Sequence, residues 1–247
     1  SRAEADRSLV TRKSAKGSTP EKPRLDKIAA GVMKFQRGAF KERRDLFSRL
    51  AEGQSPEALF ITCSDSRIDP NLLTQTDPGE LFICRNAGNI VPPHTNHTGA
   101  MTASIEYAVG ALQVPHIIIC GHSGCGAMKG AMEPKGLEGF PHVREWLGYA
   151  RAATLIADRK GAALGKKARL DLLIKENVLV QIAHLKTHPY VAARLSSGET
   201  KLHGWVYDIG TGEVLAYDEK SNAFAPVSEL YSESVSAVTH SPRKKKT

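Results

Sequence analysis

The sequence predicts an α/β fold with a mostly parallel four-stranded sheet, an antiparallel edge strand and flanking helices. Three observations favour it. Short apolar runs alternate with longer segments of helical periodicity, the order that produces parallel sheets. Near the end, a Gly-rich segment separates two alternating runs, which indicates a hairpin and therefore an antiparallel strand. Finally, clusters of Cys, His and Asp follow two of the strand-like runs, where open α/β sheets place their ligands.

The first expected element is helical. Apolar residues recur at largely helical spacings between residues 25 and 50, with an interruption near Gly38. An amphipathic segment of this length is hard to bury on so small a sheet. We therefore expect an N-terminal helical arm that wraps a partner subunit, in a dimer or a multiple of dimers.

The sheet and its helices follow. A short helical turn is expected at Pro70 and a tight turn at Asp77-Pro78-Gly79. The final hairpin runs from Leu202 to Tyr217 around Gly210-Thr211-Gly212. Strands are expected at about 58–63, 80–85 and 116–121, and helices at about 99–112, 124–132, 141–160 and 166–195, with a break at Pro189.

Charge and composition divide the chain into one folded domain with two tails. The net charge of +8 is concentrated at the two ends of the sequence. We expect a disordered basic tail at 1–24, a domain at 25–228 and a flexible basic tail at 229–247. Basic tails can bind acidic partners. Solvated arms are the favoured interpretation, with a protein partner for the tails as the alternative, and nucleic acid is not expected.

Hydropathy gives the expected compartment. No apolar run approaches the roughly 18 residues of a membrane helix, so no membrane association is expected. No apolar stretch typical of a secretory signal follows the basic N-terminal segment. We expect a cytoplasmic protein, with the carboxysome or a plastid as alternatives, and cysteines kept reduced for metal binding or packing.

Four residues predict a zinc site. Cys63 and Asp65 follow the first strand, and His122 and Cys125 follow the third. Two thiolates and one imidazole are typical zinc ligands, and a fourth position open to water is typical of a catalytic zinc. Cys63, His122 and Cys125 are therefore the expected ligands of one zinc ion per subunit.

Asp65 has two possible roles at this site. It can ligate zinc and close the coordination sphere. Alternatively, it can pair with Arg67 and accept a hydrogen bond from water at the metal, since the spacing puts both side chains on one side of an extended segment. We expect the second role, with Asp65 and Arg67 as a catalytic dyad.

With these motifs, the chain resembles the β-class carbonic anhydrases, over about residues 25–225. It looks most similar to the plant and cyanobacterial branch, including carboxysomal members. The matching stretches are Cys63-Ser64-Asp65-Ser66-Arg67, Pro78-Gly79-Glu80-Leu81-Phe82, Arg85-Asn86-Ala87-Gly88-Asn89, Ser104-Ile105-Glu106-Tyr107-Ala108 and Gly121-His122-Ser123-Gly124-Cys125-Gly126.

The resemblance implies a lyase that hydrates carbon dioxide reversibly to bicarbonate and a proton, with a place in carbon concentration. It implies that Gln54 donates to bound bicarbonate. It also implies that Phe82 and Tyr107 line an apolar slot for carbon dioxide that a neighbouring subunit completes. Gly126 is expected to let the backbone approach the substrate closely.

Other functions are compatible with part of this pattern. The same fold can hydrolyse carbonyl sulfide or carbon disulfide, and the motifs do not separate these reactions. A non-enzymatic scaffold stabilised by zinc is another alternative, although such a site does not need an Asp65–Arg67 pair beside the metal. The His-x-Glu and Pro-Cys-x-x-Cys pattern of zinc deaminases is absent from the sequence.

Overall fold

The computed structural model describes residues 25–232 and 235. They divide into two compact units, one ending at Ser55 and the other beginning at Pro56. The predicted domain 25–228 spans both units. The predicted tail at 1–24 lies outside the described residues, as does most of the tail at 229–247.

The first unit contains three helices, α1 (Leu25–Arg37), α2 (Ala39–Glu42) and α3 (Arg44–Glu52). The first break falls at Gly38, where the sequence predicts an interruption. Within the described chain, no residue of these three helices is buried. The rings of Phe35, Phe40 and Phe47 lie 5.0 to 5.9 Å apart, and they are the aromatic contacts of this unit.

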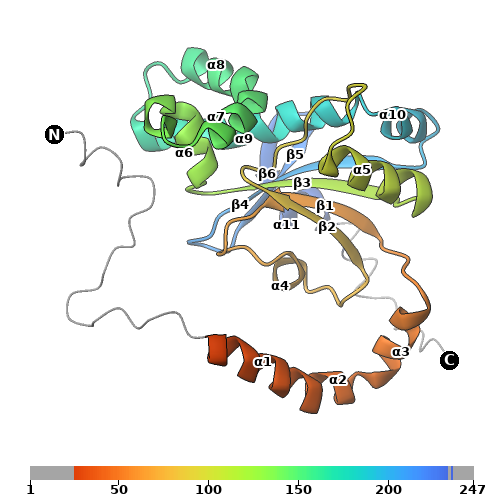
Figure 1. The fold of residues 1–247 in the computed structure, drawn as a ribbon. Helices are drawn as coiled ribbons and strands as arrows, with labels where there is room; N and C mark the ends of the chain where they lie inside the picture. The colour runs from red at the N-terminus through yellow and green to blue at the C-terminus, as the bar shows by residue number, and fades with distance from the viewer. Residues whose placement is uncertain (1–24, 233–234, 236–247) are drawn as a thin grey trace, which may run out of the picture. The chain divides into compact units, whose positions relative to one another are not determined.

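The second unit is built on a sheet with six strands (Figure 1), so the predicted four-stranded sheet with an antiparallel edge strand is one strand short. The strand order is β2-β1-β3-β4-β5-β6. The first four strands in this order are parallel, β5 runs antiparallel to β4, and β6 runs antiparallel to β5. The strands are β1 (Ala58–Cys63), β2 (Leu81–Asn86), β3 (His116–His122), β4 (Lys201–Tyr207), β5 (Val214–Asp218) and β6 (Ala223–Pro226).

The missing strand in the prediction is β6. It has four residues and ends in Pro226, and a short run with a proline gives almost no period-two signal. The predicted hairpin is present, since β4 pairs with β5 from Trp205 opposite Ala216 to Tyr207 opposite Val214. The parallel strands also occur where their apolar runs predict them.

The helices of this unit follow the predicted segments, but several are divided. The segment at 141–160 contains two helices joined by a 3-10 turn at Leu147–Ala150, and the long helix ends before Pro189. The helices are α4 (Pro70–Thr74), α5 (Ala100–Glu106), α6 (Gly126–Met132), α7 (Pro141–Trp146), α8 (Arg151–Lys160), α9 (Lys166–Leu185), α10 (Pro189–Ser196) and α11 (Val227–Leu230). A π-helical turn, Tyr107–Ala111, extends α5.

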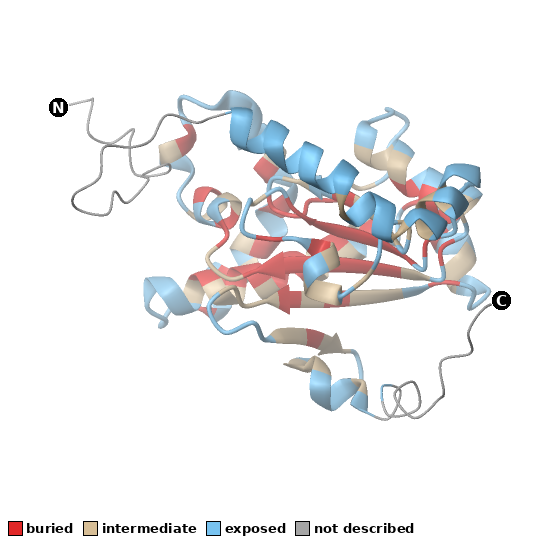
Figure 2. Cartoon of the chain, turned by 90° about the horizontal axis from the view of Figure 1, so that it is seen from below, coloured by how far each residue is buried: buried red, intermediate tan, exposed pale blue. Residues whose placement is uncertain are grey.

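The core lies on both faces of the sheet. Helices α5 to α10 cover one face (Figure 1). Leu59, Ile61 and Ile119 are fully buried and alternate along their strands with the residues of the opposite face. On the other face, Phe60 and Cys120 form a second cluster with Trp205 and Leu73 of α4. The buried residues gather in the strands (Figure 2), so the sheet is the centre of this unit's core.

The C-terminal end of the described chain contacts this second face. Tyr231 follows α11, its hydroxyl lies 3.0 Å from Nδ1 of His203, and its ring is close to that of Trp205. Tyr231 therefore packs on the sheet beyond residue 228, where the flexible tail is predicted to begin. Among the described helices, none is both long and apolar enough to cross a membrane.

Candidate metal centre

The topology of the sheet creates a crevice between β1 and β3. The chain passes from β1 to β2 on one side and later returns to β3 on the other side of β1. At such a switch point, the connections leave the carboxyl ends of the two strands in opposite directions, and ligands bind between them. Cys63 is the last residue of β1, and His122 is the last residue of β3.

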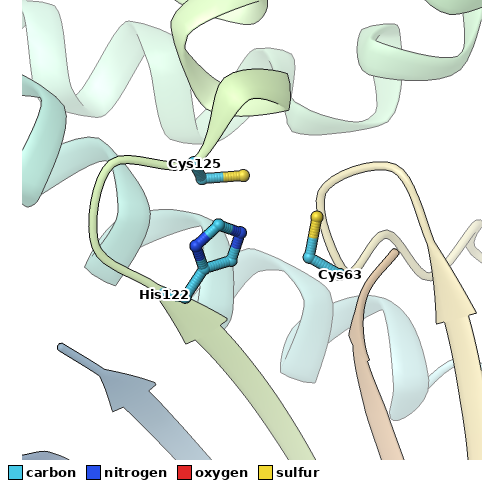
Figure 3. A group of neighbouring side chains, drawn as sticks. All are labelled: Cys63, His122 and Cys125. Carbon is cyan, nitrogen blue, oxygen red and sulfur yellow. The ribbon is translucent and has the colours of Figure 1, made fainter. Parts of the chain in front are cut away.

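The three predicted ligands meet in this crevice. Cys125 lies at the N-cap of α6, three residues after His122. The sulfur atoms of Cys63 and Cys125 and a ring nitrogen of His122 lie within 4.8 Å of one another, and all three residues are buried (Figure 3). The side chains point toward a common centre, as a metal site requires.

The tautomer of the His122 imidazole suits a metal ligand. Its Nδ1 lies 3.0 Å from the carbonyl oxygen of Ser123, and a carbonyl only accepts, so Nδ1 carries the proton. Nε2 is therefore an acceptor, yet it is buried and has no hydrogen-bond partner among the described residues. A buried polar atom without a partner is costly, and a zinc ion at this point would satisfy it. Two sulfurs and one imidazole fit zinc with one open position.

The two thiols have different pKa values. A hydrogen bond from Cys125, the largest cause, lowers the pKa of Cys63 to about 4, although burial opposes this shift. The same bond raises the pKa of Cys125. The shared hydrogen bond therefore favours the thiolate at Cys63 and the thiol at Cys125. A metal ion would replace the shared proton, because zinc binds cysteine as thiolate.

Asp65 and Arg67 form the predicted pair at the edge of this group. The guanidinium donates from Nε to Oδ1 at 2.9 Å and from Nη2 to Oδ2 at 2.7 Å. The backbone N–H of Arg67 also donates to Oδ1. These hydrogen bonds hold the pKa of Asp65 well below its usual range. The Asp65 carboxylate lies 3.8 Å from Nε2 of His122 and outside the group of three ligands.

Arg85 is a site residue that the sequence did not single out. Its Nε donates to the carbonyl oxygen of Cys63 at 3.0 Å, and its Nη2 donates to that of Asp65 at 2.7 Å. Arg85 therefore holds the backbone that carries both a ligand and the dyad. The available signal was its place at the start of the matching stretch Arg85-Asn86-Ala87-Gly88-Asn89.

The residues predicted to contact substrate are partly brought together. The rings of Phe82 on β2 and Tyr107 lie 6.0 Å apart, and Tyr107 is half exposed. Gly126 begins α6 directly after Cys125. Gln54 is exposed in the first unit, and its role stays a prediction.

Comparison with known sequences gives one consistent family. Residues 58–214 match the family model described as carbonic anhydrase. A carbonic anhydrase of Pseudomonas aeruginosa is 48% identical over 202 residues, which covers 82% of this chain and 91% of that protein. A carbonic anhydrase of Synechococcus elongatus is 45% identical over 199 residues, covering 80% of this chain and 73% of that protein.

Solved structures agree with the sequences. The structure of the β-carbonic anhydrase CcaA is similar with a TM-score of 0.80 at 43% identity, covering 82% of this chain and 98% of that one. One of the tetrameric β-carbonic anhydrases of Sordaria macrospora is similar with a TM-score of 0.64 at 31% identity, covering 78% and 93% of the two chains.

Proposed function

Because the chain belongs to the β-class carbonic anhydrases, we propose that Cys63, His122 and Cys125 hold the zinc ion with which it hydrates carbon dioxide. The reaction is reversible and gives bicarbonate and a proton. One observation carries the ligand assignment: the three buried ligand atoms converge within 4.8 Å, and the Nε2 of His122 accepts no hydrogen bond in the described chain.

Zinc in such a site acidifies water and so supplies a nucleophile near neutral pH. The proposed role of Asp65 is to orient the attacking oxygen. As a carboxylate it only accepts hydrogen bonds, so the attacking oxygen must donate its proton toward Asp65 and present a lone pair to carbon dioxide. Arg67 keeps Asp65 ionised and fixes its rotamer through two parallel hydrogen bonds. The short distance from Asp65 to His122 supports this role.

Carbon dioxide is apolar and needs an apolar slot beside the nucleophile. Phe82 and Tyr107 are the proposed lining of that slot, supported by the contact between their rings. Gln54 is proposed to donate a hydrogen bond to an oxygen of bicarbonate. Gly126, next to a ligand, is proposed to leave room for the substrate near the backbone.

The helical arm is proposed to pack on a second copy of this chain. Leu25, Ile28 and Val32 of α1 are 76%, 67% and 52% exposed. Contact of several apolar side chains of one helix with water is unfavourable, and such a patch is typical of an interaction surface. The similarity to tetrameric β-carbonic anhydrases supports assembly as a dimer or a multiple of dimers. A partner subunit would bury this surface and complete the carbon dioxide slot.

The domain boundaries and the biological setting are also proposals. A carbonic anhydrase domain at 25–228 is supported by the family match at 58–214 and by the arm that precedes it. A role in carbon concentration, in the cytoplasm or a carboxysome, is supported by similarity to the Synechococcus elongatus and Synechocystis carbonic anhydrases.

The decisive experiment combines metal analysis with an assay. The purified chain should contain about one zinc per subunit and should hydrate carbon dioxide. Removal of the metal by a chelator should abolish hydration, and added zinc should restore it. Hydration that continues in the fully metal-free protein would contradict the proposal. Parallel assays with carbonyl sulfide and carbon disulfide distinguish the related hydrolases.

A further inference from the structure

Two amide side chains of α9 are buried beneath the metal site, and the proposed chemistry does not use them. Asn177 is 1% exposed and Gln181 is fully buried, one helical turn later. Burial of an amide costs free energy unless its donors and acceptor find partners. Positions four residues apart lie on the same face of a helix, so both amides face the same neighbour.

That neighbour is the loop that follows β2. The Nδ2 of Asn177 donates to the carbonyl oxygen of Gly88 at 3.0 Å. The Oδ1 of Asn177 accepts from Nε2 of Gln181 at 2.9 Å. In turn, the Oε1 of Gln181 accepts from the backbone N–H of Val91 at 2.8 Å. The two amides thus hold the loop at two points, three residues apart.

The loop contacts a proposed zinc ligand. The backbone N–H of Gly88 donates to the sulfur of Cys63 at 3.4 Å. Gly88 has a φ of +85°, and a Cβ there would lie 2.9 Å from the side chain of Met128 and 3.1 Å from that of Ala127. The conformation that aims this N–H at the sulfur therefore requires glycine and leaves little space for adjustment.

We propose that Asn177 and Gln181 are positioning residues of the metal centre, because they hold Gly88 so that its N–H donates to the Cys63 thiolate. This inference rests on the proposed function. The hydrogen bond fixes the direction of the sulfur lone pairs and withdraws electron density from them. The identity of two side chains on α9 thereby sets the zinc affinity and the electron donation of a ligand on β1.

The test compares zinc binding in variants of α9. Asn177→Leu removes the donor to Gly88 with a side chain of the same branched shape, and Asn177→Ser is a smaller second variant that leaves room for water. Leu170→Ala is the control, because Leu170 is a buried apolar residue of the same helix. Zinc dissociation constants are measured by competition with a chromophoric chelator. The cobalt-substituted proteins report the thiolate-to-metal charge-transfer band.

Loss of an outer hydrogen bond to a ligand costs about 10- to 100-fold in metal affinity. We expect zinc to bind at least about tenfold more weakly to both Asn177 variants, because the Cys63 sulfur is no longer held in its direction toward the metal. Their charge-transfer band should move to longer wavelength, since the unbonded sulfur is the better electron donor. The control should keep the wild-type affinity and band even if its melting temperature falls.

A wild-type zinc affinity and an unshifted band in Asn177→Ser would overturn the inference, whether or not Asn177→Leu folds. An equal change in the Leu170 control would also overturn it, because the effect would then be general destabilisation. Both results leave the proposed function intact. If the wild-type chain itself binds no zinc, the proposed function fails, and this inference fails with it.

Discussion

At the residue scale, the four cysteines occupy two kinds of environment. Cys63 and Cys125 share a proton at the crevice, which lowers the pKa of Cys63. Cys84 and Cys120 lie within strands, and burial raises the pKa of Cys120 to about 12. The thiols of Cys84 and Cys120 therefore act as small apolar side chains. The lowered pKa of Cys63 instead favours the thiolate, the form that binds a metal.

Replacement of Cys63 should therefore differ from replacement of Cys84. We expect Cys63→Ser to lose zinc and hydration activity together, because a serine hydroxyl is a poor zinc ligand. Cys84→Ala should retain both. Metal content and carbon dioxide hydration are measured on the same preparations. Full zinc content in Cys63→Ser would show that the ligand assignment is wrong.

Asp65→Asn tests the orienting role. The amide can donate a hydrogen bond where the mechanism needs only an acceptor, so we expect kcat to fall by about 10²-fold or more with zinc content unchanged. Asp158→Asn on α8 is the control and should keep the native kcat. Stopped-flow hydration assays measure the effect. Near-native turnover in Asp65→Asn would refute the role of Asp65.

The pKa of Asp65 gives a pH prediction. Arg67 lowers this pKa in the folded chain from the ordinary value of 3.8, so the pair stabilises the fold above that pH. The stabilisation is lost only as the pH falls through the lower, folded value. Carboxyl ¹³C resonances should show no titration of Asp65 between pH 6 and pH 4. In Arg67→Met the same resonance should begin to titrate in this range, and identical curves would contradict the prediction.

At the element scale, α9 packs unusually close to the sheet. Val178 of this helix contacts two adjacent strands at positions where both have glycine. A Cβ at Gly121 of β3 would lie 3.0 Å from Val178, and one at Gly204 of β4 would lie 2.9 Å from both Val178 and Ile182. The close approach brings Asn177, the preceding residue, within reach of the loop beside Cys63.

Gly204→Ala should therefore destabilise the protein. The added methyl group overpacks the contact between α9 and β4, and overpacking typically costs about 1–3 kcal/mol. Gly148→Ala is the matched control, since a Cβ there meets nothing within 4 Å. Urea unfolding of the two zinc-loaded variants measures the difference. Equal free energies of unfolding would show that α9 can move away without cost.

The sequence predicts those elements and ligands whose patterns lie within a few consecutive residues. The apolar runs at 58–63 and 116–121 specify buried strands, and His122 and Cys125 are three residues apart. The supporting residues carry no such signal. Asn177 acts on Gly88, 89 positions away in sequence, and its helix gives the same periodicity with or without that contact. The strand β6 was missed because four residues are too few for a pattern.

At the scale of the whole molecule, the first unit presents an apolar surface that its own three helices leave exposed. The surface runs along α1 through Leu25, Ile28 and Val32. Helices this short are marginal in water unless an apolar face packs on something. We therefore propose that the arm packs on a second copy of this chain, and that the same assembly completes the active site at Phe82 and Tyr107.

Negative charge introduced on the apolar surface of α1 should separate the subunits. We expect Ile28→Asp with Val32→Asp to shift the chain toward monomer and to lower hydration activity, because the carbon dioxide slot is then incomplete. Lys27→Asp, on the same helix, is the control for a charge change alone. Sedimentation and activity are followed together on dilution. A monomer with full activity would contradict the proposal.

The crevice between β1 and β3 has a consequence for the lifetime of the protein. An ion bound there would connect two strands whose ligands are far apart along the chain, and it is the fold that brings these three ligands together. By mass action, free zinc at 100 times its dissociation constant adds about 2.7 kcal/mol to the free energy of unfolding. Resistance to heat and proteolysis should then follow the zinc supply. When zinc is scarce, the protein without zinc should therefore be degraded faster than the zinc-loaded protein.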